Sequence, residues 1–186
     1  VLDVPFSYAD LFETVVKGIR SQNELAQESS EVADFWSMLQ GFQTSGKCVD
    51  KAHYRIRYMK SFRPISVKED IEFKEARPIL YLNMAAVASL FNSRNMNATV
   101  NRSNWSTIMS YLKSHSSYLG LKQDRFTILL PSGLPDYSIE IVNNEQVRKV
   151  KVNRPKALCF DYLQLKEAFG LELETEVITD VQDSED

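Results

Sequence analysis

The chain has 186 residues, of which 44% are hydrophobic and 25% are charged, and its formal net charge is −3. This length predicts one domain or two small ones, and the apolar content excludes a broadly disordered chain. The sequence has no secretory signal, no apolar run long enough to span a bilayer and no lipidation motif, so we expect a cytoplasmic protein without a membrane partner. It opens without an initiator methionine, and we therefore expect it to be part of a longer protein.

The charges are unevenly distributed along the chain. Residues 94–156 contain ten basic and four acidic side chains, whereas residues 172–186 contain seven acids and no base. A basic segment beside an acidic tail indicates a polyanionic partner. The alternative interpretation is a solvated surface on which the charges are merely uneven.

Residues 1–46 are predicted to form a helical hairpin. Apolar residues at helical spacing predict one helix over residues 7–27, and a second over residues 31–42 begins after the break at Ser29–Ser30–Glu31. Gly41 and Gly46 are expected to end the hairpin. The second helix has an apolar face that we expect in the core, formed by Val32, Phe35, Trp36, Leu39 and Phe42.

Residues 47–62 alternate between apolar and polar side chains, which is typical of a half-buried strand. Its polar face carries Arg55 and Arg57. We interpret these arginines as charges that keep an edge strand soluble, and contact with phosphates is the alternative.

The stretch from Pro78 to Lys113 predicts a short strand at 79–82, a helix at 83–91, a polar turn at 92–101 and a second helix at 103–115. Basic β-strands follow, and a last strand at 157–160 leads into a short helix at 162–169. Helix, turn, helix and basic hairpin is the order of a winged-helix module. We therefore predict an α+β fold in which the hairpin 1–46 packs on a winged-helix-like domain, residues 47–173, followed by a disordered acidic tail, residues 174–186.

The sequence contains none of the motifs GxxxxGK[ST], GxGxxG, HExxH, GxSxG or CxxC. Cys48, Cys159, His53 and His115 lack the spacing of zinc ligands, so we predict no metal site and interpret both cysteines as buried thiols. We also predict no catalytic residue and no cofactor. A nuclease or protease site would need a cluster of carboxylates or a Cys–His contact that spacing alone does not indicate.

DNA binding is the function that this organisation predicts. The second helix of a helix-turn-helix presents its outward residues to bases, and a basic wing contacts the phosphate backbone. The predicted DNA-binding residues are Arg94, Arg102, Asn104, Thr107 and Lys113 in the helix-turn-helix and Arg148, Lys149, Lys151, Arg154 and Lys156 in the wing. A winged helix used for protein contacts or for homo-oligomerisation is the alternative.

Four stretches carry a resemblance to a known family: IRSQNELAQESSEVADFWSMLQ, ILYLNMAAVASLF, SNWSTIMSYLKSHSSYLGLK and ALCFDYLQLKEAFGLELE. In this order they resemble the region after the ATPase core in primase-helicase-like proteins of bacterial mobile elements and phages, which are related to the virulence-associated-E and poxvirus-type primase-helicases. The resemblance implies an accessory module that helps an upstream ATPase domain of the same parent chain to engage DNA. The ATPase motifs are absent here, so we expect this chain by itself not to be an enzyme.

Overall fold

The structure is a computed structural model that describes residues 8–92, 105–142 and 145–175. Its elements, in chain order, are α1 (Tyr8–Thr44), β1 (Tyr54–Phe62), β2 (Ile71–Leu82), α2 (Met84–Asn92), α3 (Trp105–Ser114), β3 (Tyr118–Gln123), β4 (Phe126–Thr127), β5 (Tyr137–Val142), β6 (Glu145–Val150), β7 (Val152–Asn153), β8 (Lys156–Asp161) and α4 (Tyr162–Phe169). The predicted α+β class is confirmed. Most of the predicted acidic tail lies outside the described residues.

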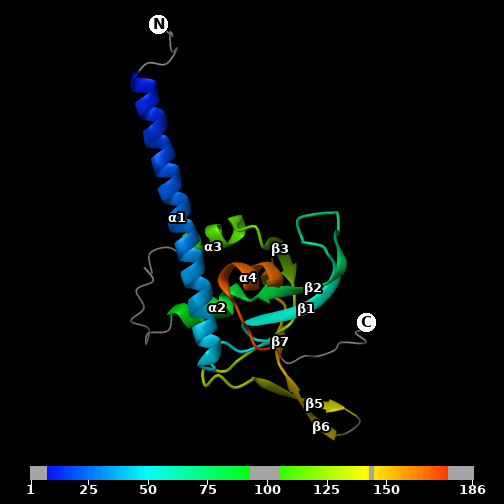
Figure 1. The fold of residues 1–186 in the computed structure, drawn as a ribbon. Coiled ribbons are helices and arrows are strands. Elements are labelled where there is room, and N and C mark those ends of the chain that lie inside the picture. The colour runs from blue at the N-terminus through cyan, green and yellow to red at the C-terminus, as the bar shows by residue number, and fades with distance from the viewer. Residues whose placement is uncertain (1–7, 93–104, 143–144, 176–186) are drawn as a thin grey trace.

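The predicted helical hairpin is wrong, because α1 is one continuous helix of 37 residues. Ser29, Ser30 and Gly41 all lie within it, and Figure 1 shows its first half extending beyond the rest of the fold. Serine and glutamate cost a helix only a few tenths of a kcal/mol relative to alanine, about 0.5 at most. Continuing the helix through an exposed Ser29–Ser30 pair is therefore cheaper than forming a turn.

Four antiparallel strands form the main sheet in the order β1-β2-β8-β3. One face of this sheet packs against all four helices, and Figure 1 shows α4 over it with α1 alongside. Trp36 of α1 is fully buried there and meets Phe160 of β8 edge to face, with ring centroids 5.2 Å apart. The apolar face predicted for residues 31–42 is thus confirmed as part of the main core.

The opposite face of the sheet carries a second, smaller buried cluster made of Phe62, Ile79, Tyr81, Phe126, Ala157 and Cys159. No helical residue within the described ranges belongs to it, and we call this the helix-free face. Phe126 of β4 packs over part of the helix-free face. Both cysteines are free and buried, as predicted, and burial raises the pKa of the Cys48 thiol to about 12.

His53 gives the fold a pH dependence. Its ring is buried, and Nδ1 accepts a hydrogen bond from the Val49 backbone N–H at 3.0 Å. Burial lowers the pKa of His53 below its ordinary value of 6.5. Because the folded state favours the neutral ring, this contribution to stability is complete above pH 6.5 and is lost as the pH falls below it.

We therefore expect the free energy of unfolding, measured by urea denaturation, to be lower at pH 5.5 than at pH 7.5. In the variant His53→Gln, whose side-chain oxygen can still accept a hydrogen bond, that difference should shrink. His115 will leave a smaller residual dependence, because burial also lowers its pKa. Equal pH dependence in the two proteins would contradict this assignment.

Candidate nucleic-acid interface

The helix-turn-helix part of the predicted site is described only at α3. Arg94, Arg102 and Asn104 lie outside the described residues. Thr107 is half-buried and Lys113 is exposed on α3, which begins and ends within two residues of the predicted helix. The inner face of α3 buries Ile108 and Leu112, as the pattern predicted.

The predicted wing is a β-ribbon, and its two faces differ in chemistry. In β5 and β6, Tyr137 pairs with Val150, Ser138 with Lys149, and the register continues to Val142 and Glu145. Paired residues share a face and successive residues alternate between faces. We name the two sides the ion-paired face, with Ser138, Glu140, Val142, Glu145, Val147 and Lys149, and the outer ribbon face, with Tyr137, Ile139, Ile141, Gln146, Arg148 and Val150.

Two of the lysines predicted to bind DNA, Lys149 on the ion-paired face and Lys151 directly after β6, already have partners. Lys149 Nζ is 3.2 Å from a carboxylate oxygen of Glu140, and Lys151 Nζ is 2.9 Å from one of Asp136. The third acid of the ribbon, Glu145, is on the same face. These carboxylates cancel much of the positive field that a phosphate would meet at the two lysines.

The outer ribbon face has no carboxylate and carries exposed apolar side chains. Ile139 and Ile141 are 70% and 74% exposed. The Arg148 guanidinium lies over the Tyr137 ring, 4.0 Å from its centroid, which is a cation–π contact. Arg148 is therefore held by an aromatic ring and keeps its positive charge uncompensated.

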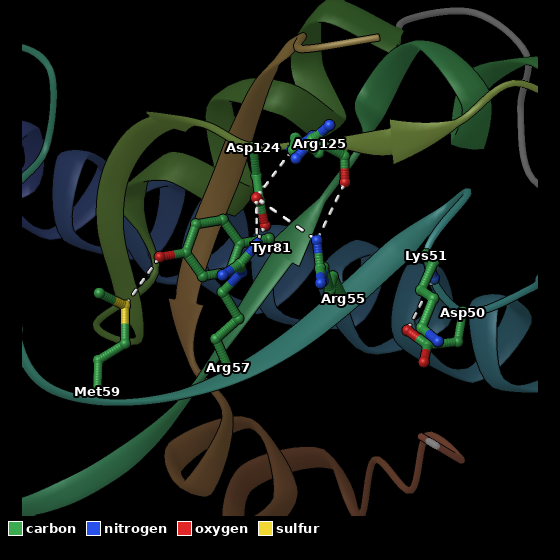
Figure 2. Close-up of polar contacts among 8 residues, drawn as sticks. All are labelled: Asp50, Lys51, Arg55, Arg57, Met59, Tyr81, Asp124 and Arg125. Carbon is green, nitrogen blue, oxygen red and sulfur yellow. Dashed lines mark hydrogen bonds and ion pairs between the residues drawn. The ribbon is translucent and has the colours of Figure 1, made fainter. Parts of the chain in front are cut away.

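At the base of the ribbon, Asp124 draws together residues from distant parts of the chain. Arg57 of β1 binds its carboxylate with two hydrogen bonds of 3.0 and 2.8 Å, and the Arg125 backbone N–H donates to it at 2.8 Å. Arg55 approaches the same carboxylate at 3.8 Å and donates to the Arg125 carbonyl at 3.5 Å. Figure 2 shows both arginines reaching from β1 toward Asp124.

This geometry corrects the interpretation of Arg55 and Arg57 as solubilising edge charges. Their side chains are only 19% and 29% exposed, and that of Asp124 is 8% exposed. They cover the helix-free face beside Tyr81, whose hydroxyl donates to Met59 Sδ at 3.0 Å (Figure 2). Burial raises the pKa of Tyr81, and the nearby arginines act in the opposite direction.

Arg154 and Lys156 of the predicted wing flank Pro155, whose backbone meets that of Asp124. Lys156 pairs with Gln123 in the sheet register, and the Asp124 backbone N–H donates to the Pro155 carbonyl at 3.4 Å. The segments 55–57, 122–125 and 154–156 contain one carboxylate, that of Asp124. Lys156 is on the opposite face of the sheet from Arg55 and Arg57, because Ala157, the residue after it, belongs to the helix-free face. The other basic residues, which we call the basic cluster, are Arg55, Arg57, Lys122, Arg125 and Arg154.

The structure does not bring all the predicted residues together. In Figure 1 the β5–β6 hairpin lies well apart from α3, which carries Lys113. The β4–β7 register instead brings Arg154 toward Arg125, whose carbonyl accepts from Arg55. Arg55, Arg57 and Arg125 were not among the predicted site residues. The alternation of residues 47–62 indicated Arg55 and Arg57 as phosphate contacts only as the alternative interpretation. No local pattern identifies Asp124 as their partner, because the contact from Arg57 to Asp124 spans 67 residues of sequence.

No protein-family model, curated protein or solved structure matches this chain. The resemblance to primase-helicase-like proteins therefore stays a prediction. Within the described ranges, no three His, Cys, Asp or Glu side chains are grouped so that they could hold a metal ion. The helices of the described part of the chain include none that is long and apolar enough to cross a membrane.

Proposed function

We propose that this chain is a non-catalytic DNA-binding accessory module of a larger replication or mobilisation protein. The observation that carries the proposal is the basic cluster, whose segments hold five basic side chains and one carboxylate, that of Asp124, although Lys122 also interacts with Asp70. Asp124 is engaged by Arg57 and more loosely by Arg55, so the remaining cations, Arg125 and Arg154 among them, are available to phosphates. A concentration of uncompensated positive charge attracts a polyanion.

The order of the elements supports a winged-helix interpretation of this module. β2, α2, α3, β3, the ribbon and β8 follow one another as the strand, two helices, strand, wing and strand of a winged helix. The last strand, β8, lies between β2 and β3, as the last strand does in that fold. We assign most of the affinity to the basic cluster, because the ribbon projects away from α3 (Figure 1).

The double substitution Arg125→Ala and Arg154→Ala tests this assignment. Removing two phosphate contacts should weaken DNA binding at low salt and reduce the slope of log affinity against log salt by about 1.5. Binding is measured by fluorescence anisotropy with a labelled duplex and a labelled single strand across a salt series.

The matched control is Lys149→Ala with Lys151→Ala, which removes the same charge from residues that already have carboxylate partners. This control should change the slope less. If the unaltered protein has no DNA affinity at low salt, the proposed function is wrong. If the two double variants have equal effects, the assignment to the basic cluster is wrong.

A second candidate function is self-association through α1. Leu11, Phe12, Val15 and Ile19 lie on one side of its projecting half, and each is more than half exposed. An apolar helical stripe of this kind is typical of a protein interface. A stable oligomer in a sizing measurement, together with no DNA binding, would favour this candidate over the first.

A further inference from the structure

We propose that the outer ribbon face and the adjoining part of the basic cluster bind single-stranded nucleic acid. In this arrangement unstacked bases lie against Tyr137, Arg148 and Ile139, and the phosphates lie at Arg125 and Arg154. The inference rests on the proposed function and specifies its ligand and its surface.

The register of the strands makes these residues one continuous face. β4 pairs with β7 through Thr127 opposite Val152. Val152 follows Val150 of β6 by two residues, so the two side chains are on the same side of the extended chain. Lys151, between them, points to the ion-paired face, where it meets Asp136. The next positions beyond Thr127 and Val152 on the outer side are Arg125 and Arg154.

Charge on the ribbon is sorted between its two faces. Glu140 and Glu145 are its acids and both occupy the ion-paired face, and Asp136, directly before β5, is paired with Lys151. The outer side carries Arg125, Arg148 and Arg154 and has no carboxylate. A face with arginines only is complementary to a partner with negative charge along its whole length, which favours a nucleic acid over a protein surface of mixed charge.

The apolar content of the same face determines which form of nucleic acid fits. In a duplex the flat faces of the bases are stacked on one another and only their edges are accessible, whereas single strands expose these faces to aromatic rings and guanidinium planes. The stacked pair of Arg148 and Tyr137 offers such a plane, and the exposed Ile139 side chain extends the apolar area beside it. Purely electrostatic binding of duplex DNA would make no use of these side chains.

The test compares labelled oligo-dT with a labelled duplex of equal length, using the whole chain at low salt. The double variant Tyr137→Ala with Ile139→Ser should bind oligo-dT about tenfold more weakly, because stacking on an aromatic side chain contributes on that order per base. Its affinity for the duplex should be unchanged. Both side chains are at the surface, so the variant is expected to remain folded.

The matched control is Val142→Ser with Val147→Ser, which removes exposed apolar side chains from the ion-paired face of the same hairpin. It should leave oligo-dT binding unaltered. A second readout uses oligonucleotides containing 5-bromouracil, whose photocrosslinks are mapped by mass spectrometry. Crosslinks within residues 137–150 support the inference, and crosslinks confined to α3 contradict it.

The outcomes separate the inference from the proposed function. If duplex and oligo-dT bind with equal affinity, and neither ribbon variant changes that affinity, the inference is overturned and the proposed function stands. If neither nucleic acid binds at low salt, both are overturned. If neither binds and the Tyr137→Ala, Ile139→Ser variant dissociates an oligomer, the outer ribbon face is a protein interface instead.

Discussion

Replacing Asp124 with asparagine should lower the free energy of unfolding by about 3 kcal/mol, because it leaves two half-buried guanidinium groups without a compensating charge. Arg57 would lose its bidentate carboxylate partner, and Arg55 its nearest negative charge. Asparagine has the size of aspartate and keeps an oxygen that can accept from the Arg125 backbone N–H. The expected loss of stability therefore comes from the missing negative charge and not from altered packing.

The measurement is urea denaturation of the purified variant, followed by circular dichroism. The control is Asp136→Asn, which breaks the more exposed ion pair with Lys151 and should cost no more than about 1 kcal/mol. A double-mutant cycle with Arg57→Met measures the coupling between Arg57 and Asp124 directly. If Asp124→Asn lowers the free energy of unfolding no more than Asp136→Asn does, Asp124 does not hold β1 to the segment after β3.

Gly120→Ala should destabilise the fold by a similar amount, about 3 kcal/mol, through backbone strain and a steric clash together. Gly120 lies in β3 at a φ of +127°, and an added Cβ would come within 2.6 Å of Pro64 Cβ. The Pro64 loop has little freedom to move aside, because the Ile65 backbone N–H donates to the Leu121 carbonyl at 2.8 Å. The effect should appear as a lower denaturation midpoint with an unchanged m-value.

Gly133→Ala is the matched control for Gly120→Ala. Gly133 also has a positive φ, of +82°, but an added Cβ would meet nothing within 4 Å. Its cost should be limited to the conformational penalty of about 1 kcal/mol. Adding Pro64→Gly to Gly120→Ala removes the Cβ that causes the clash and should restore part of the loss. Equal effects of the two alanine substitutions would show that Pro64 contributes nothing.

Much of the fold follows from local patterns in the sequence. The periodicity of Val32, Phe35, Trp36, Leu39 and Phe42 predicted the buried face of α1, and the predicted helices at 83–91 and 103–115 match α2 and α3 within two residues. The break predicted at Ser29–Ser30–Glu31 is wrong, because these residues can cap a helix and can also continue one. Whether the helix ends or continues at these residues is decided by packing against distant parts of the chain, which the local sequence does not show.

The candidate site was less predictable than the fold. Lys149 and Lys151 stood out as part of a basic run, but their partners Glu140 and Asp136 become neighbours only through the ribbon register. Once Val142 is known to pair with Glu145, residue parity alone puts Glu140 and Glu145 on one face and Arg148 on the other. Arg57 and Asp124 show no such periodicity, because their contact depends on how β3 and the segment after it fold back across the sheet.

The continuous helix α1 has a mechanical consequence. At 1.5 Å per residue, its 37 residues form a rod of about 55 Å, anchored to the sheet at its C-terminal end (Figure 1). Anything that binds the stripe at Phe12 and Val15 is held at a fixed distance and direction from the ribbon. Deleting one residue in the middle of the rod would turn the stripe by about 100° around the helix axis, whereas deleting seven would return it close to its original direction. The length of α1 therefore sets the distance of the stripe from the sheet, and the helical repeat sets the direction in which the stripe faces.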